Sequence, residues 1–403
     1  MTLNSKDMEK VFKIIEEYKG KIDTSISIPL KEYEQRYEKV WKQLEERSID
    51  MGFFFWYREM PGDGMYLTGY NPTIERASGV IVPGKPPMLL AGPESGILAD
   101  EVGLDLDTEF LEEFSIPDEF YEGITCKPMD EVISEYVGKE IKTIGYMTSY
   151  DIIPAKFFEL LHSGFGKDVT VVDASDILEE LRYEKSETEF KCMKQADTIA
   201  CAAMRSMLAV LKPGMRETEV AAVADFTVKA LGGSGYGFET IVNSGDRCRT
   251  VIGPASNKII EEGEIVQMGV SPSYEGYKGV SRRAVIAGER NSIQKQYFET
   301  LNKAYELASM ELKNVAENDL PNNRVDLAAR NYFATQEIDG VNMKSCHFFS
   351  TCHGTGLTEC LEKMVIHPEK EQYYGENVGI MLDLGSYGHP NVDICGGCVE
   401  DAY

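Results

Sequence analysis

The sequence predicts two domains, an α/β domain over residues 1–176 and an α+β domain over residues 177–403. Short apolar runs alternate with amphipathic segments through the first part, which is typical of helices packed on a sheet. A long helical run then begins at Ile177, and strand-like segments return near the end of the chain. With 403 residues, 43% of them hydrophobic, the chain is long enough to bury two cores.

The elements of the first domain follow from the spacing of its apolar residues. The N-terminal segment and residues 30–47 carry apolar residues at helical spacing, with charges between them. Residues 51–57 (MGFFFWY) form an uninterrupted apolar run, which is typical of a buried strand. Residues 78–92 hold two short apolar runs around a Pro-Gly pair, the pattern of a hairpin. Two further strands are expected at residues 142–147 and 169–175.

The second domain is expected to contain long helices and several strands. Its first helical run, residues 177–214, is broken once near Arg182 and ends at Pro213-Gly214. The other helices are expected at residues 218–231, 292–315 and 324–337. The strands are expected at residues 238–242, 265–270, 280–287, 378–384 and 398–403.

Composition excludes some partners and indicates a compartment. The formal net charge of -26 argues against nucleic acid and anionic membranes, because both attract basic surfaces. We find neither a signal-peptide pattern nor an apolar run of about 20 residues, the length of a membrane span. Nine cysteines, an odd number, indicate reduced thiols rather than a disulfide framework. These features predict a cytoplasmic protein.

A histidine in a glycine-rich turn is the most informative feature of the sequence. The segment STCHGTGL places His353 in that turn, and Asp383 and Glu400 follow at strand-like spacing. Imidazole can give and take protons near neutral pH, and carboxylates can orient it or hold a cationic group. We therefore predict that His353, Asp383 and Glu400 converge in one pocket as the catalytic residues.

Several motifs occur in an order that resembles a known family. They are RYEKSE at 182–187, LKPG at 211–214, YEGY at 274–277, Arg283, HGTGL at 353–357 and VED at 399–401. Together they resemble the creatinase, prolidase and methionine aminopeptidase family, the M24 peptidases. The resemblance covers about residues 177–403, and the preceding region resembles the N-terminal domain of creatinase and prolidase. It implies an α/β N-terminal domain plus an α+β pita-bread C-terminal domain.

The resemblance also implies positions for metal ligands. Metallopeptidases of this family hold two metal ions with two aspartates, one histidine and two glutamates. The histidine and glutamate positions correspond to His353, Asp383 and Glu400. The first aspartate position falls at Gly269 or Gln267 and the second at Val280, so neither carboxylate is present. Because most of the charge that would hold two divalent cations is missing, the expectation is an enzyme with no metal among its site residues and no cofactor.

The expected function is that of a creatinase-like, metal-independent hydrolase or lyase. Its substrate would be a small carboxylate-bearing metabolite with a C–N bond, because creatinase shows that the fold can work without metal. One alternative is a Xaa-Pro dipeptidase-like metallohydrolase with substitute ligands. Another is a catalytically dead, peptidase-like module that binds a peptide or protein.

Two cysteines extend the predicted pocket. Cys398 shares a strand face with Glu400, because side chains two residues apart point the same way. Cys360 stands seven residues after His353, where many relatives have a second histidine that contacts substrate. Both cysteines are predicted to line the substrate site. The alternative to a cofactor-free enzyme is a single zinc or iron at His353, Cys360, Cys398 and Glu400, since thiolate and imidazole bind either metal.

Arginines in this acidic chain indicate an anionic or zwitterionic substrate. Arg247 and Arg249 share a face if their segment is extended, and the planar guanidinium binds carboxylates at two points. Arg76, in IERASGV, resembles the arginine that creatinase lends to the substrate carboxylate of the neighbouring subunit. This resemblance implies a homodimer.

A second pair, Arg282 and Arg283, lies in the predicted strand 280–287. Arg283 matches a family arginine beside the ligand strand, and we interpret it as a structural ion-pair partner of Asp383 or Glu400. Counted from Ser244-Gly245, one carboxylate position of creatinase falls on Arg282 and its catalytic histidine falls on Ile252. Hydrolysis of creatine itself is therefore not supported residue by residue.

Overall fold

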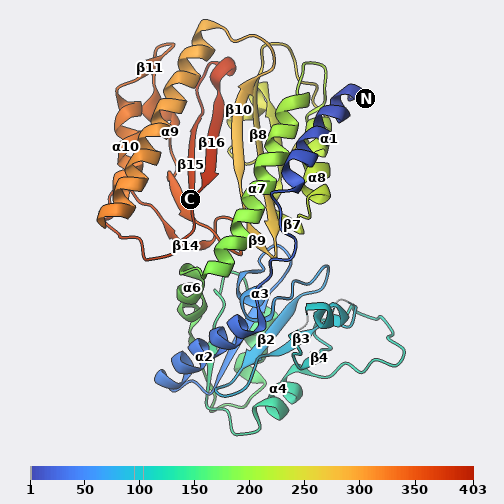
Figure 1. The fold of residues 1–403 in the computed structure, drawn as a ribbon. Helices are drawn as coiled ribbons and strands as arrows, with labels where there is room; N and C mark the ends of the chain where they lie inside the picture. The colour runs from blue at the N-terminus through green and yellow to red at the C-terminus, as the bar shows by residue number, and fades with distance from the viewer. Residues whose placement is uncertain (1, 95, 103) are drawn as a thin grey trace. The chain divides into compact units, whose positions relative to one another are not determined.

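The computed structural model describes residues 2–94, 96–102 and 104–403, which form two compact units (Figure 1). The N-terminal unit is Ser27–Tyr183, and the C-terminal unit contains the residues through Ile26 together with Glu184–Tyr403. Helix α1 (Ser5–Lys19) therefore belongs to the C-terminal unit and not to a domain spanning 1–176. The physical reason is a long-range contact, since the buried Asp7 carboxylate of α1 forms an ion pair with Lys212 Nζ at 2.5 Å.

The N-terminal unit is built on a six-stranded sheet of order β4-β3-β2-β1-β5-β6. Its strands are β1 (Met51–Trp56), β2 (Ala77–Ile81), β3 (Met88–Ala91), β4 (Thr108–Phe110), β5 (Thr143–Tyr146) and β6 (Thr170–Asp173). Its helices are α2 (Leu30–Glu46), α3 (Gly62–Thr68), α4 (Met129–Val137), α5 (Ala155–Ser163), α6 (Ser175–Tyr183) and the 3-10 helix η1 (Gly96–Val102). As predicted, β1 is buried throughout and β2 pairs antiparallel with β3.

Four long helices follow in the C-terminal unit: α7 (Glu187–Val210), α8 (Glu217–Ala230), α9 (Ser292–Asn318) and α10 (Asn323–Ala334). The break predicted near Arg182 is present, because α6 ends at Tyr183 and α7 starts after a new N-cap. There the Ser186 side chain accepts from the Glu189 amide while the Glu189 carboxylate accepts from the Ser186 amide. Helix α7 packs along β8 and α9 along β15, so the two helices contact different parts of one sheet.

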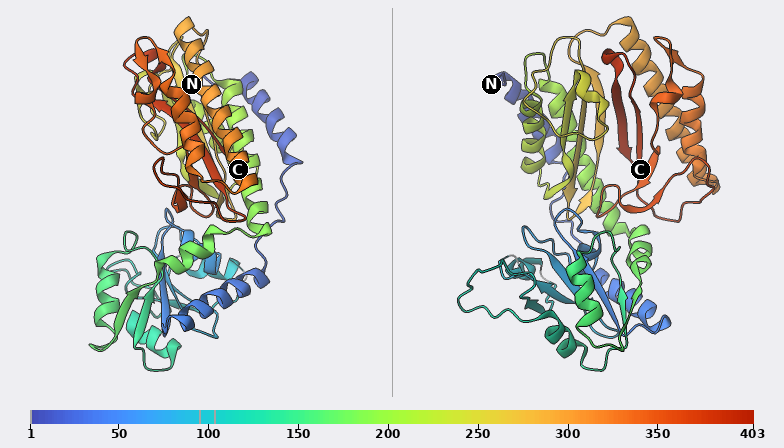
Figure 2. Two further views of the ribbon diagram at one scale, coloured as in Figure 1. Left: turned by 90° about the vertical axis from the view of Figure 1, so that its left-hand side faces the viewer. Right: turned by 180° about the vertical axis from the view of Figure 1, so that it is seen from behind.

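The sheet of the C-terminal unit has the order β14-β13-β15-β16-β10-β8-β7, with β9 paired to β8. Its strands are β7 (Gly235–Ser244), β8 (Ile265–Tyr274), β9 (Tyr277–Lys278), β10 (Ser281–Ile286), β13 (Cys352–Gly354), β14 (Glu362–Val365), β15 (Ile380–Tyr387) and β16 (Gly396–Ala402). Figures 1 and 2 show the last strand, β16 (red), beside the yellow-orange β10 inside the sheet. Residues far apart in the sequence therefore become cross-strand neighbours.

The remaining elements are short and carry too few residues for a periodic pattern. They are the two-stranded β11 (Glu337–Ile338) and β12 (Val341–Asn342), and the 3-10 helices η2 (Gly245–Arg249), η3 (Met343–Cys346) and η4 (Val392–Ile394). The sequence did not predict β13 and β14 for the same reason. Among the described residues, no helix combines the length and the apolar character that crossing a membrane requires.

Candidate metal centre

A row of polar residues crosses three neighbouring strands of the C-terminal sheet. Arg282 on β10 pairs in register with Glu400 on β16, and Glu400 pairs in register with Asp383 on β15. Directly opposed residues in an antiparallel sheet present their side chains on the same face. All three side chains are buried, with at most 11% of each exposed. Strand register alone therefore gathers one guanidinium and two carboxylates.

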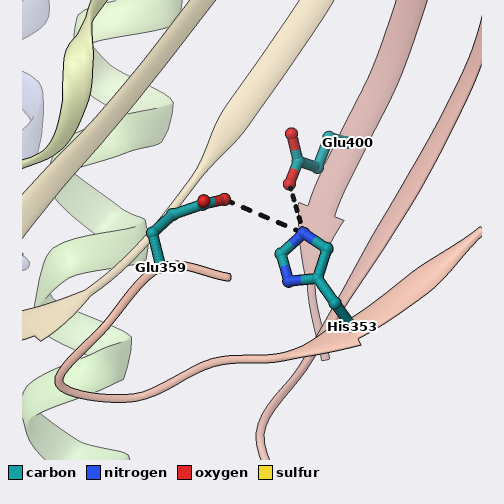
Figure 3. Close-up of side chains that lie close together, drawn as sticks. All are labelled: His353, Glu359 and Glu400. Carbon is teal, nitrogen blue, oxygen red and sulfur yellow. Dashed lines mark ion pairs between the residues drawn. The ribbon is translucent and has the colours of Figure 1, made fainter. Parts of the chain in front are cut away.

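His353 joins this row from the next strand, β13. It pairs with Met381, two residues before Asp383, so its side chain lies on the same sheet face. Its Nε2 atom lies 3.6 Å from Glu400 Oε1 and 3.9 Å from Glu359 Oε1 (Figure 3). Nδ1 lies 3.2 Å from the Gly354 carbonyl oxygen, which can only accept. With a proton on Nδ1, the Nε2 atom faces the two glutamates, so that a second proton, or a cation in its place, lies between the imidazole and the carboxylates.

Glu359 is the residue that sequence reasoning missed at this site. It lies in the turn between β13 and β14, six residues after His353, and its side chain is only 9% exposed. Among the residues that the structure describes, two sets of possible metal ligands result: His353 with Glu359 and Glu400, and Asp383 with Cys398 and Glu400. In each set the ligand atoms lie within 4.8 Å of one another. The one sequence signal for Glu359 was an acidic residue two positions after the glycine-rich segment STCHGTGL.

Arg282 is the centre of a buried polar network. Its NH1 atom lies 3.3 Å from Asp383 Oδ2 and 3.3 Å from Glu400 Oε2. Its NH2 atom donates to the Val251 carbonyl at 2.6 Å and to the Tyr387 hydroxyl at 2.9 Å. The Arg282 side chain is 2% exposed. A guanidinium so enclosed stays charged and neutralises carboxylates that burial would otherwise destabilise.

The three positions proposed for ligand aspartates have other contacts. The Gln267 amide donates to backbone carbonyls at 3.2 Å, and its Oε1 accepts from the Tyr387 hydroxyl at 2.6 Å. Gly269 lies opposite Arg282, where a Cβ would come within 2.8 Å of the arginine Cγ. Val280 is buried. In place of ligand carboxylates, Gly269 therefore makes room for Arg282, and Gln267 is linked to it through the Tyr387 hydroxyl.

The two cysteines predicted at the pocket differ in their positions. Cys398 Sγ donates to Asp383 Oδ1 at 2.9 Å, so this thiol is part of the cluster. Cys360 is exposed and, among the described residues, belongs to neither set of possible ligands. A zinc or iron set that includes Cys360 is therefore not assembled here. Glu359, the preceding residue, points inward instead.

Electrostatics show that several groups of the cluster hold their protons more tightly than usual. Burial and the neighbouring Glu400 raise the pKa of Glu359 to about 7, and the same two causes raise the pKa of Asp383 to about 6. Burial alone would lower the pKa of His353, but Glu400, Glu359 and Asp383 raise it to about 9. Burial opposes ionisation of Glu400, yet His353 and Arg282 keep its pKa below the usual value. Acidic groups in excess here retain protons that a cation would replace.

The residues present fit one divalent cation better than two. Three carboxylates carry three negative charges when ionised, and Arg282 neutralises one of them. Two charges remain, which equals the charge of one divalent ion. Among the described residues, buried Glu400 Oε1 has no hydrogen-bond partner, and it points toward His353 Nε2 (Figure 3). An unsatisfied buried carboxylate oxygen is costly unless a cation or donor meets it.

The arginines predicted to bind substrate have protein partners. Arg247 Nε forms an ion pair with Glu217 at 3.0 Å, and Arg249 Nε pairs with Asp246 at 2.5 Å. Both guanidinium groups also donate to backbone carbonyls. These contacts hold η2 and the loop that follows it. Substrate binding by the two arginines stays a prediction.

The prediction for Arg283 needs a correction. Arg283 NH2 pairs with Asp401 at 2.7 Å rather than with Asp383 or Glu400. Strand alternation is the reason, because adjacent residues of β10 point to opposite faces of the sheet. Arg282 makes the predicted pairs instead.

On the N-terminal unit, Arg76 is exposed and lines a pocket of about 490 Å³ with Tyr57 and Arg58.

Comparison with known proteins assigns the family. The description "Metallopeptidase family M24" matches residues 191–393, and "Creatinase/Prolidase N-terminal domain" matches residues 36–183. The chain belongs to metallopeptidase family M24. The Xaa-Pro dipeptidase of Pyrococcus horikoshii is 29% identical over 354 residues, which cover 88% of this chain and 90% of that protein. The Xaa-Pro dipeptidase of Pyrococcus furiosus is 26% identical over a similar length, again 88% and 90% of the two chains.

Solved structures show the same fold. The prolidase from Pyrococcus horikoshii superimposes with a TM-score of 0.72 at 23% identity, covering 91% of this chain and 94% of that one. The X-Pro aminopeptidase from Thermotoga maritima gives a TM-score of 0.74 at 22% identity, covering 91% and 93%. The predicted fold class, an α/β N-terminal domain plus an α+β pita-bread C-terminal domain, is confirmed. The prediction of a hydrolase is also confirmed at the level of the M24 family.

Two other predictions are wrong. A creatinase-like, metal-independent enzyme is contradicted because the similar proteins are Xaa-Pro dipeptidases and prolidases. The expectation of no cofactor fails with it, since the matching family is one of metallopeptidases. The error came from treating the loss of two aspartates as the loss of metal binding. That inference left out Glu359, which the turn after β13 brings to His353.

Proposed function

We propose that this protein is a Xaa-Pro dipeptidase-like hydrolase that uses one divalent cation held by His353, Glu359 and Glu400. The observation that carries the proposal is the convergence of these three side chains, whose ligand atoms lie within 4.8 Å of one another. One imidazole with two carboxylates suits zinc, iron or manganese. When bound, such a cation would polarise the scissile carbonyl and activate water.

The chain's own residues hold this ligand set in position. The contact of His353 Nδ1 with the Gly354 carbonyl fixes the imidazole, and the ion pair with Arg282 fixes Glu400. Cys398 donates to Asp383, which keeps that carboxylate beside Glu400. Because the supporting contacts are present before substrate arrives, the site needs little rearrangement to bind a cation.

The proposed substrate is a dipeptide with proline in the second position. It rests on two relatives named Xaa-Pro dipeptidase, whose similarity extends over 88% of this chain. A dipeptide is a small zwitterion, in agreement with the anionic or zwitterionic substrate predicted from the arginines. We further propose a cytoplasmic homodimer in which Arg76 reaches the neighbouring subunit's site. Sedimentation velocity on the wild type and on Arg76→Glu tests the dimer.

Metal content and dipeptide turnover test the main proposal together. Protein purified without chelator is expected to carry one transition-metal ion per chain by elemental analysis. Chelation should abolish release of proline from Gly-Pro, and added Mn²⁺, Co²⁺ or Zn²⁺ should restore it. Ala-Ala serves as the dipeptide without proline. Loss of a residue that only supports a metal ligand lowers metal affinity by about 10- to 100-fold. Because Glu359 is proposed as a ligand itself, Glu359→Gln should lower the affinity by more than about 100-fold.

A matched control and a clear negative outcome complete this test. Glu369→Gln changes an exposed glutamate in the segment between β14 and β15, and it should leave metal content and turnover unchanged. Full turnover of Gly-Pro by protein shown to be free of metal would overturn the proposal. Absence of turnover on every Xaa-Pro dipeptide by metal-loaded protein would overturn the substrate assignment.

A further inference from the structure

We propose that Arg282 takes the place of a second cation in this site, so that its guanidinium limits the chain to one bound metal ion. The inference concerns the site of the proposed function and relies on it for the first cation only. It starts from the fact that the two sets of possible ligands share Glu400. A carboxylate shared between two ligand sets can bridge two cations.

The two oxygens of Glu400 face different partners. Oε1 lies 3.6 Å from His353 Nε2 and has no hydrogen-bond partner among the described residues. Oε2 lies 3.3 Å from Arg282 NH1, the same nitrogen that lies 3.3 Å from Asp383 Oδ2. Glu400 therefore bridges an open ligand set and a guanidinium. The second set is closed because Arg282 occupies its carboxylate oxygens.

The surroundings of Arg282 hold the guanidinium in this place. Its other terminal nitrogen donates to Val251 and Tyr387, and the absence of a side chain at Gly269 leaves room for the arginine stem. The side chain is 2% exposed, so it cannot swing into solvent without breaking these contacts. Arginine stays protonated in proteins, and a charge fixed here repels a second dication.

Removal of Arg282 should open the second ligand set. Asp383, Cys398 and Glu400 would then lie together with two carboxylates that lack a positive partner. Cys398 Sγ is already 2.9 Å from Asp383 Oδ1. A thiolate with two carboxylates can bind Co²⁺ or Zn²⁺, and burial of unpaired carboxylates favours cation uptake. Sulfur coordination gives this second site a spectroscopic signature that the first site lacks.

The test uses Co²⁺ on the intact chain. Wild type is expected to bind one Co²⁺ and to show no sulfur-to-cobalt charge-transfer band. Arg282→Ala should bind two and show the band, and Arg282→Ala with Cys398→Ser should lose the band. Arg283→Ala is the matched control, because its guanidinium pairs with Asp401 instead. It should behave as wild type. Binding is measured by titration calorimetry and elemental analysis.

The possible outcomes separate this inference from the proposed function. One Co²⁺ in both wild type and folded Arg282→Ala would leave the proposed function standing and overturn the role of Arg282. Two Co²⁺ in wild type would overturn it as well. No Co²⁺ in wild type but a sulfur-bound ion in Arg282→Ala would support the role of Arg282 in excluding a cation from the second ligand set. It would contradict the proposed first site.

A second variant covers the case in which Arg282→Ala does not fold. Gln267→Asp, Val280→Asp and Arg282→Thr together supply carboxylates where the family resemblance places them and remove the guanidinium. This triple variant is expected to bind two Co²⁺ per chain. A folded triple variant that still binds one would count against Arg282 as the residue that limits metal content.

Discussion

Two buried acidic clusters in the C-terminal unit differ in how their carboxylates are satisfied. Asp326 on α10 is 0% exposed and accepts from the Thr351 amide at 3.1 Å, from the Thr351 hydroxyl at 2.6 Å and from Arg330 Nε. Burial alone would raise the pKa of Asp326, but His347, Arg330 and Thr351 lower it to about 2. At the candidate metal centre, the Glu359 side chain is 9% exposed, and burial together with the neighbouring Glu400 raises its pKa to about 7.

The difference lies in the number of donors around each carboxylate. Asp326 is surrounded by donors and needs nothing from outside the protein. The cluster of His353, Glu359 and Glu400 has fewer donors: Arg282 reaches Glu400 Oε2, but Glu400 Oε1 has no hydrogen-bond partner among the described residues. A closed cluster stabilises the fold, whereas an open one is completed by a ligand. Mutation of the open cluster should therefore reduce mainly the turnover, and mutation of the closed cluster should reduce mainly the free energy of unfolding.

The largest effect is expected from His353→Ala. Loss of the imidazole should reduce Gly-Pro turnover by about a thousandfold or more, because a bound cation supplies several kcal/mol to the transition state. Above about pH 10, where His353 is neutral in both the folded and the unfolded state, the free energy of unfolding of the metal-free protein should change by no more than about 1 kcal/mol. Steady-state kinetics and chemical denaturation measure the two quantities. A large loss of stability with turnover retained would reverse the assignment of the open cluster.

Asp326→Ala should give the opposite pattern. It leaves Arg330 Nε and the Thr351 amide without their acceptor, which should cost about 3 kcal/mol of unfolding free energy. Metal stoichiometry in the folded fraction should stay at one. Glu317→Ala is the control, since its exposed ion pair with Lys313 contributes at most about 0.5 kcal/mol. Equal losses in both variants would show that Asp326 is not a closed structural cluster.

Metal addition should stabilise the protein through the open cluster. A cation present at about 100 times its dissociation constant adds about 2.7 kcal/mol to the free energy of unfolding. The increase in Tm should vanish in Glu359→Gln and persist in Glu369→Gln. Thermal unfolding with and without Mn²⁺ or Zn²⁺ measures it. If Glu359→Gln kept the full increase in Tm, the cation would have to bind elsewhere.

A smaller effect is expected from acid. The pKa of Asp326 is depressed from 3.8 to about 2 in the folded state, so its stabilising contribution is present above pH 3.8 and is lost as the pH falls through 2. The contribution amounts to about 2 kcal/mol. The stability advantage of wild type over Asp326→Asn should therefore shrink between about pH 4 and pH 2. A difference that stays constant over that range would mean that Asp326 ionises normally.

Most elements of the fold could be predicted because their patterns are local. The apolar run at β1, the hairpin of β2 and β3, and the interruption between α6 and α7 all depend on neighbouring residues. The short β13 has no such pattern, since three residues are too few to show alternation. The attachment of α1 to the C-terminal unit could not be predicted, because it depends on contacts such as that with Lys212, far along the chain.

The site was predicted in part for a related reason. His353, Asp383 and Glu400 belong to motifs with a recognisable order, and the structure brings them together. Glu359 was missed because its inward orientation depends on the turn after β13. Arg282 was counted among several arginines, and its role is visible only once β10 is paired with β16. Motif order thus identified three members of the cluster, while strand pairing and the turn after β13 supplied its other members.

The sequence by itself determined the family, the spacing of the helices and strands, and the excess of acidic residues. Only the tertiary structure decided which arginine faces the carboxylates and which oxygen of Glu400 remains available. The physical reason is that helix and strand periodicity comes from residues a few positions apart. Strand register and turn conformation depend on packing between segments that are distant in the chain. A shift of one residue in β10 would place Arg283, not Arg282, beside Asp383 and Glu400.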